Sequence, residues 1–333
     1  MDQKIIQLQN YLKNLEPQKL DLKNINEITV KEMNRGGYNI NYLLTADSHK
    51  FVFRLNTDKY LDVENQIQYE YEILKNLENK NIAPKVYFAD TTKENLEFDV
   101  LVEEFIDNKP LIFNNQFLKD FAELIKKLHS LPLPDNKLLI RNKKPLLDQW
   151  QFIKNKIDFI KASNYHQRFL NFFNHYLPKV NDYVLKYTNL FTTEDICLNH
   201  RDLVIENVLQ TDKGLRLIDW QAVMADDPSY DLAFFICDIM IEWNLNRSLT
   251  AKEKQIFLKS YKVDDNLLNK INIRQPLVYL EIFVWLSYRA TYLRDKLNKN
   301  LIENNDRKFV QKRIIAYENF LEENKMKKYL KNF

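Results

Sequence analysis

The stretch that decides the fold is HRDLVIENVL, residues 200–209, which is followed after a turn by LRLIDW, residues 215–220. The first segment places Asp202 five residues before Asn207. The second is a short apolar strand, and Asp219 stands just past it, so its carboxylate should emerge at a strand end. Gly214 supports a tight turn, and VLQTDKGLRLID is therefore predicted to form a hairpin.

Residues 200–207 match the pattern H-R-D-L-x-x-x-N, in which the Asp is a catalytic base and the Asn is a metal ligand. On this reading Asp202 accepts or orients the proton of a substrate hydroxyl. Asn207 and Asp219 would hold Mg²⁺ together with phosphate oxygens and water. The alternative for Asp202 is a capping or loop-stabilising role. His200 is predicted to hold backbone rather than to perform chemistry.

Phosphoryl transfer also needs a cation on a strand, paired with a glutamate on a helix. KFVFRLN offers Arg54, and the helical pattern over 63–79 offers Glu70, which lies beside the apolar stripe. The alternative for Arg54 is a surface arginine on a strand. Gly36 and Gly37, between two predicted strands, would let backbone approach the nucleotide phosphates, although a hairpin turn would use the same residues.

The segment EEFIDN, residues 103–108, is predicted to connect two lobes. The backbone of Glu104 and Ile106 would face the adenine of ATP, although an ordinary strand end would have the same sequence.

Secondary-structure patterns change near residue 107. Residues 1–106 are strand-rich with one main helix, and residues 107–333 are mostly helical. The predicted class is α+β, a protein-kinase-like fold with a small antiparallel-sheet N-lobe and a larger helical C-lobe.

Composition excludes several other classes of protein. The net charge is +3, from 49 basic and 46 acidic residues, which is too balanced for a nucleic-acid-binding surface. Cys197 and Cys237 lie 40 residues apart, without metal-ligand spacing, and buried free thiols are expected. The sequence contains no uninterrupted apolar run of the kind that a signal peptide or a membrane-spanning helix requires. We therefore expect a cytoplasmic protein without membrane insertion.

These segments resemble the aminoglycoside phosphotransferase and choline kinase superfamily, and within it most closely the bacterial choline kinases. NHRDLVIENVL resembles its catalytic loop, and LRLIDWQAVMADDPSYDLA its metal-binding segment. The resemblance implies ATP and Mg²⁺ as cofactors, Arg54 with Glu70 at the ATP phosphates, and a structural role for Asp231.

The sequence departs from this family at two places. Gln221 stands where the family usually has Glu. The phosphate loop GGYNINYLL is one residue short of the family pattern, so either Asn39 or Asn41 could contact ATP.

The acceptor is predicted to be a small molecule rather than a protein. Protein kinases usually have Lys where this chain has Val204, and the chain lacks D-F-G, A-P-E and room for an activation loop. A quaternary ammonium is recognised by aromatic faces, and Tyr230 and Trp285 are the candidates for that pocket, with core packing as the alternative for each. Choline is the favoured acceptor. Ethanolamine, thiamine or an aminoglycoside, and a catalytically inactive nucleotide-binding module, are the alternatives.

Overall fold

The computed structural model describes residues 3–135, 137–163 and 167–333. Its internal contacts divide the chain into two compact units, each assembled from several segments. Unit 1 consists of residues 1–141, 198–225 and 251–261, and unit 2 of residues 142–197, 226–250 and 262–333. The sequence-based boundary after residue 106 separates types of secondary structure, whereas these units follow packing, so that boundary stays a prediction.

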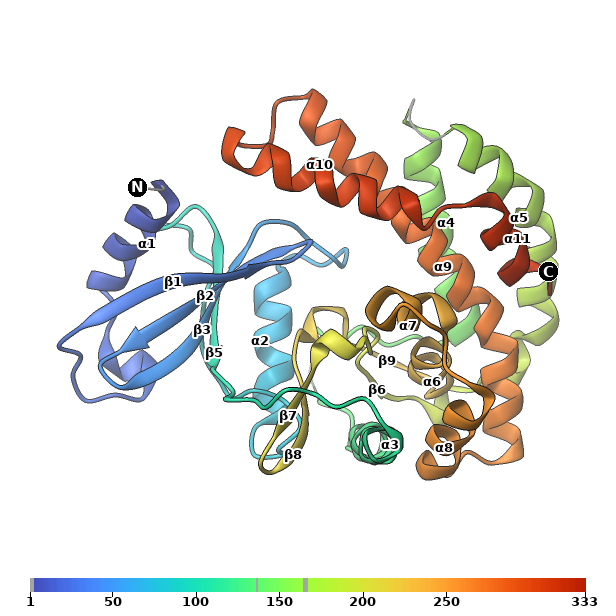
Figure 1. Ribbon diagram of the computed structural model, residues 1–333, viewed down its shortest axis with the longest axis horizontal. Helices are drawn as coiled ribbons and strands as arrows, with labels where there is room; N and C mark the ends of the chain where they lie inside the picture. Colours follow the sequence, from blue (N-terminus) through green and yellow to red (C-terminus); the bar gives the residue numbers. More distant parts are fainter. Residues whose placement is uncertain (1–2, 136, 164–166) are drawn as a thin grey trace. The chain divides into compact units, whose positions relative to one another are not determined.

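Unit 1 is built on a five-stranded antiparallel sheet in the order β1-β2-β3-β5-β4 (Figure 1). Its strands are β1 (Ile28–Arg35), β2 (Asn39–Ala46), β3 (His49–Asn56), β4 (Val86–Asp90) and β5 (Asp99–Glu104). The predicted strand-rich first hundred residues and the α+β class are therefore confirmed.

The central strand β3 presents its side chains alternately to two faces of the sheet, as a pleated strand must. Phe51 and Phe53 point into an apolar core that α1 (Gln3–Lys13) helps to build. Arg54 points to the other face, where it meets α2 (Gln66–Leu77). In Figure 1 the two helices lie on opposite sides of the sheet.

The local sequence around α2 fixes where the helix begins and which face it buries. The side chain of Asn65 accepts a hydrogen bond from the Gln68 backbone N–H, which caps the helix start. Ile67 and Leu74 are buried on its inner face, and Glu70 lies with them at 0% exposure. Glu70 therefore lies beside the apolar stripe, as the sequence predicts, and is buried with it.

Unit 1 also contains the loop of residues 200–207, together with two helices and most of four short strands. They are α3 (Asn115–His129), α8 (Ala251–Tyr261) and four short strands, β6 (Cys197–Asn199), β7 (Val208–Thr211), β8 (Gly214–Leu217) and β9 (Met224–Asp226). β7 and β8 pair as the predicted antiparallel hairpin, with Thr211 opposite Gly214.

Gly214 adopts a φ of +107°, a conformation that side chains of L-residues rarely take. An added Cβ would meet nothing within 4 Å, so Gly214→Ala should destabilise the protein through backbone strain alone. We expect a loss of about 1–2 kcal/mol in the free energy of unfolding, measured by urea denaturation.

Gly36→Ala is the matched control, because Gly36 has no positive φ and its added Cβ would lie 3.6 Å from the Asn39 oxygen. If the two substitutions cost the same free energy of unfolding, the strain at Gly214 is not real.

Unit 2 is helical throughout its described regular structure, apart from the residues it contributes to the ends of β6 and β9. Its helices are α4 (Pro145–Lys161), α5 (Gln167–Tyr187), α6 (Ser229–Phe235), α7 (Asp238–Leu245), α9 (Asp265–Asn298), α10 (Asn304–Asn319) and α11 (Glu323–Leu330). The mostly helical pattern predicted after residue 107 is confirmed for the residues that the structure describes.

The 34-residue helix α9 packs against α4, α6, α10 and α11. It buries charged side chains as well as apolar ones. Arg274, for example, donates to Asp226 over 2.8 Å, and both side chains are fully buried. No helix in the described part of the chain is long and apolar enough to cross a membrane.

Candidate active site

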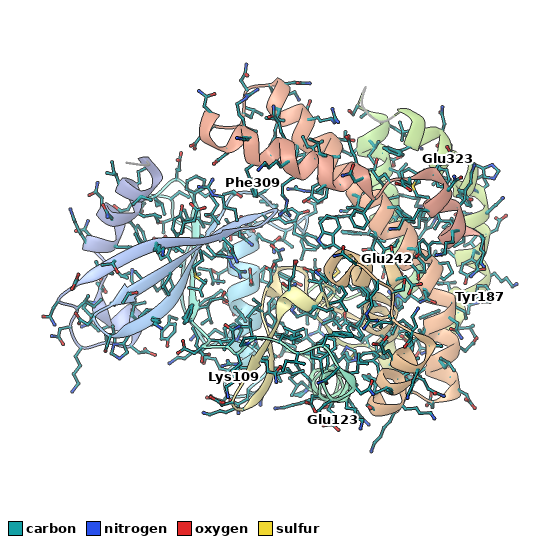
Figure 2. The ribbon with its side chains drawn as sticks, in the orientation of Figure 1. Lys109, Glu123, Tyr187, Glu242, Phe309 and Glu323 are labelled. Atoms are coloured by element: carbon teal, nitrogen blue, oxygen red, sulfur yellow. The ribbon has the colours of Figure 1, made fainter. Side chains whose placement is uncertain are left out.

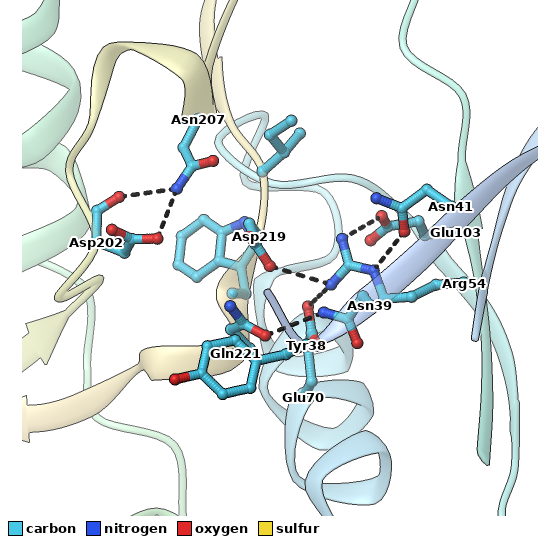
Figure 3. A network of polar contacts seen from close by, with 12 residues as sticks. Tyr38, Asn39, Asn41, Arg54, Glu70, Glu103, Asp202, Asn207, Asp219 and Gln221 are labelled. Atoms are coloured by element: carbon cyan, nitrogen blue, oxygen red, sulfur yellow. Dashed lines mark hydrogen bonds and ion pairs between the residues drawn. The ribbon is translucent and has the colours of Figure 1, made fainter. Parts of the chain in front are cut away.

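Hydrogen bonds from the Asn207 side chain to Asp202 stabilise the loop of residues 200–207, which follows β6. The amide nitrogen of Asn207 donates to the Asp202 carboxylate (Oδ2) and to the Asp202 carbonyl oxygen, each over 3.0 Å. Figure 3 shows the Asn207 amide oxygen turned away from Asp202. Arg201, just before the Asp, has a φ of 66°, an uncommon conformation for a residue with a side chain. The loop therefore fixes the Asp202 carboxylate and leaves the Asn207 oxygen directed elsewhere.

The β7–β8 hairpin delivers Asp219 to the same end as Asn207. Val208 pairs with Leu217, and one residue further out the Ile218 N–H donates to the Asn207 carbonyl over 3.0 Å. Asp219 follows with a φ of 65°, and its side chain is 29% exposed. The register of the hairpin thus places the two predicted metal ligands on adjacent strand ends.

His200 supports this arrangement from behind. It is fully buried, and its Nε2 lies 3.1 Å from the carbonyl oxygen of Ile218. Its ring also packs edge-on against Trp220, with the ring centroids 4.7 Å apart. These contacts hold the backbone next to Asp219, as predicted for a structural histidine.

Arg54 lies at the centre of a buried group of polar side chains (Figure 3). Its Nη1 donates to Glu70 over 2.5 Å and contacts Asp219 over 3.4 Å, and its Nη2 donates to Glu103 over 3.1 Å. Its Nε donates to Asn41 over 3.2 Å. The structure therefore brings together the strand cation and the helix glutamate that the sequence pairs, and it adds Glu103, which the sequence reasoning missed.

The charges in this group shift one another's pKa values. Burial raises the pKa of Glu70 and of Glu103, and the neighbouring Arg54 offsets only part of that rise. Burial acts to lower the pKa of Arg54, but Glu70, Glu103 and Asp219 outweigh it and raise that pKa well above its usual value. Arg54 consequently stays positively charged, as a clamp for phosphate oxygens must.

The Gly-Gly turn connects to the segment after Asp219 through side-chain amides. Asn39, at the start of β2, donates to Gln221 over 3.0 Å and accepts from Asn56 over 2.9 Å. Asn41 is tied instead to Arg54 and, over 2.8 Å, to Asn34. Gln221 is therefore a direct partner of Asn39, at the start of the strand that follows Gly36 and Gly37.

Helix α2 also anchors the η5 turn (Trp220–Ala222) that follows Asp219. Gln66 donates to the Gln221 carbonyl over 2.9 Å, and the Tyr69 hydroxyl donates to the Val223 carbonyl over 2.5 Å. Nothing in the helical pattern distinguishes these two polar residues from solvated ones. Their contacts could therefore not be predicted from the sequence.

The connector residues lie at the end of β5. The Glu104 N–H donates to the Lys85 carbonyl over 2.8 Å, and its side chain pairs with Arg216 through contacts of 3.0 and 2.8 Å. Ile106 follows the strand and is buried. A role of these two residues at adenine stays a prediction.

The acceptor candidates lie in unit 2. Tyr230 on α6 is only 2% exposed, its hydroxyl donates to Glu281 over 3.0 Å, and the Arg274 guanidinium lies 5.1 Å from its ring centroid. Trp285, one turn after Glu281 on α9, is partly exposed. Asp231 is fully buried in the first turn of α6. Tyr230 is therefore part of the packing of unit 2, whereas Trp285 retains an accessible surface.

The donor set of Asn207 and Asp219 is compatible with Mg²⁺. Both offer oxygen atoms, and Mg²⁺ is usually held by one or two protein ligands together with phosphate oxygens and water. The described residues contain no cluster of three or more His, Cys, Asp or Glu side chains arranged to hold a metal on their own.

Residues 29–264 match the phosphotransferase enzyme family, which is well over half of the chain. The chain belongs to this family. The matched region of this phosphotransferase contains Arg54, Glu70, Asp202, Asn207 and Asp219, which are the residues assembled above.

Individual relatives of this phosphotransferase are distant in sequence. It is 24% identical over 264 residues to a protein LicA homolog of Metamycoplasma hominis, covering 69% of this chain and 96% of that protein. The solved ethanolamine kinase of Plasmodium vivax superposes with a TM-score of 0.63 at 20% identity, covering 92% and 85% of the two chains. The choline kinase of Cryptosporidium parvum gives 0.60 at 16% identity, covering 99% and 97%. The protein-kinase-like fold is thereby confirmed.

Proposed function

We propose that this phosphotransferase is an ATP-dependent kinase of a small-molecule alcohol, and that choline is its acceptor. The observation that carries the proposal is the assembly of Asp202, Asn207, Asp219, Arg54 and Glu70 within one packed unit. These side chains are the parts that phosphoryl transfer requires: a hydroxyl-orienting acid, two oxygen ligands and a buried cation.

In this proposal Asp202 accepts the proton of the acceptor hydroxyl as the hydroxyl oxygen attacks the γ-phosphorus of ATP. The new O–P bond replaces the bond between that phosphorus and the β,γ-bridging oxygen, and ADP leaves. The hydrogen bonds from Asn207 hold the Asp202 carboxylate in one orientation, so no reorganisation is needed during the reaction. Arg54, fixed by Glu70, binds phosphate oxygens of ATP. Asn207 and Asp219 would hold Mg²⁺, which when bound neutralises charge on the phosphates.

An aromatic group in unit 2 supports a cationic acceptor. Trp285 packs edge-on against Tyr317 with centroids 5.4 Å apart, and Trp243 lies 4.6 Å from Phe320. Such rings attract quaternary ammonium groups through their negative faces. We place the acceptor's ammonium at Trp285. Tyr230 is buried, so we give it an indirect role: its hydroxyl holds Glu281, one turn before Trp285 on α9.

A lysine ammonium of the same unit is held by an aromatic ring and an acid. Lys325 on α11 lies with its Nζ 4.7 Å from the Phe320 ring centroid and 2.6 Å from Glu242. Figure 2 labels Glu242. This region of unit 2 therefore already pairs a cation with an aromatic ring and an acid. Two of the similar solved structures are an ethanolamine kinase and a choline kinase, which supports an acceptor of the amino alcohol class.

A coupled ADP-release assay with Mg-ATP tests the proposal. The acceptors are choline, ethanolamine, thiamine, kanamycin and a generic peptide, each at matched concentration. We expect choline to give the highest kcat/KM. Preference for ethanolamine, thiamine or kanamycin would show that choline is not the acceptor, but the enzyme would still be a kinase of a small-molecule alcohol. Turnover of the peptide alone would contradict the proposal.

Trp285→Ala should raise the KM for choline about 10-fold and change the KM for ATP little, because a desolvated cation–π contact contributes about 1–2 kcal/mol. Tyr288→Ala is the matched control. Tyr288 lies on the same helix and is also partly exposed, but it packs against Phe159. Equal effects of both variants on the KM for choline would remove Trp285 from the pocket.

A further inference from the structure

Arg54 is held at all three of its nitrogens by groups from three different elements. Nε donates to Asn41 of β2, Nη1 to Glu70 of α2, and Nη2 to Glu103 of β5. The guanidinium is planar, so three such contacts fix both its position and the orientation of its plane. A lysine ammonium is a single point charge on a flexible stem and cannot meet three acceptors placed in this way.

The sheet register explains why Glu103 reaches this arginine. Arg54 pairs with Leu101, and Val52 pairs with Glu103. Directly paired residues in an antiparallel sheet share a face, and the diagonal neighbour two residues along lies within reach of a long side chain. Glu103 therefore projects from the face that α2 covers, toward Arg54.

Glu103 and Glu70 depend on Arg54 for their charge balance. Both carboxylates are at most 3% exposed, and each has one oxygen for which the described residues provide no hydrogen-bond partner. Arg54 is the one cation within ion-pair distance of either carboxylate among the residues that the structure describes. A buried carboxylate without a paired cation is strongly destabilising.

We propose that Glu103 is a positioning residue that orients Arg54 toward the ATP phosphates and makes arginine, rather than lysine, obligatory at position 54. The orienting part rests on the proposed function, whereas the requirement for arginine follows from the packing of unit 1. Glu103 itself need not touch the substrate.

The test is a double-substitution cycle with Arg54→Lys, Glu103→Met and the combined variant. Methionine resembles glutamate in shape without the charge. In the Arg54→Lys variant the lysine satisfies Glu70 and leaves Glu103 uncompensated, so we expect the melting temperature to fall by about 5 °C or more. In the Glu103→Met background the same lysine substitution should lower it by less than about 2 °C.

Kinetics separate positioning from a merely structural role. Glu103→Met should raise the KM for ATP about 10-fold and leave the KM for the acceptor within about 2-fold. The kcat/KM for ATP of the combined variant should exceed that of Arg54→Lys by about 10-fold or more, because lysine then has a single carboxylate partner. Glu78→Gln, which removes a partly exposed pair with Lys75, is the control and should change neither parameter.

Two results would overturn the inference. One is an Arg54→Lys variant as stable and active as the wild type. The other is a combined variant no better than Arg54→Lys. If Glu103→Met fails to fold, Glu103→Gln replaces it in the same cycle. The melting temperatures need no turnover, so a wild-type protein that phosphorylates none of the acceptors would defeat the proposed function while the cycle still decides the role of Glu103.

Discussion

Replacing Asp202 by Asn is expected to lower kcat for the preferred acceptor by about 10³-fold, because a positioned general base contributes 10²–10⁴-fold. An amide cannot accept the hydroxyl proton, and it would also face the Asn207 amide nitrogen, which now donates to the Asp202 carboxylate and carbonyl oxygens. The substitution conserves shape, so the melting temperature and the binding of ADP should change little. Stopped assays of ADP release, with calorimetric titration of ADP, measure the two effects separately.

Asp212→Asn provides the matched control for this variant. Asp212 lies at the tip of the β7–β8 hairpin, its side chain is 80% exposed, and its ion pair is with Lys109. It should retain wild-type kcat. An Asp202→Asn variant with kcat within a few-fold of wild type would show that Asp202 caps its loop and does no chemistry.

Arg54→Met is expected to lower the free energy of unfolding by about 3–5 kcal/mol, because it leaves Glu70 and Glu103 buried without their cation. The proton that such carboxylates would then take up only partly relieves the cost. The variant should also lose ATP-dependent turnover, since no described cation remains at the centre of the group. Urea denaturation followed by circular dichroism measures the change in stability.

Arg294, a partly exposed arginine, provides the control for Arg54→Met. Arg294 pairs with Glu318 over 2.6 Å, but the two side chains are 40% and 25% exposed. Arg294→Met should therefore cost less than about 1 kcal/mol. If both arginine substitutions lower the free energy of unfolding by the same amount, burial does not determine how strongly the Arg54 ion pairs stabilise the protein.

The central parts of the site could be predicted from the sequence because each has a strong local signal. Asp202 and Asn207 have fixed spacing, Asp219 ends an apolar strand, and the helical stripe of α2 places Glu70 on its buried face. Arg54 interrupts an apolar strand on the side opposite Phe51 and Phe53. Spacing and periodicity are sufficient for these residues because their positions depend on one element each.

Glu103 was not predicted because its role depends on register between strands far apart in sequence. It follows VLV in β5 next to another glutamate, and alternation alone does not show which of the two is buried. The choice between Asn39 and Asn41 is of the same kind. The structure gives the two residues different partners, Gln221 and Arg54, through pairings that no sequence pattern specifies.

Aromatic residues in the helical region were the least predictable. Tyr230 and Trp285 both occur in apolar helical sequences, yet one is buried on Arg274 and Glu281 and the other remains accessible. The composition of a helix face does not distinguish core packing from a pocket wall. The glycines show a similar limit: Gly214 needs its positive φ, whereas Gly36 does not adopt one.

The most direct test of the central claim is ³¹P NMR of the protein incubated with Mg-ATP and choline. The account predicts loss of the ATP γ-phosphate resonance together with the appearance of one phosphomonoester resonance from phosphocholine, in equal amounts. Asp202→Asn should produce neither change. ATP that is hydrolysed only to inorganic phosphate, with choline and with each of the other small alcohols, would contradict the assignment of this site to phosphoryl transfer onto a small-molecule hydroxyl.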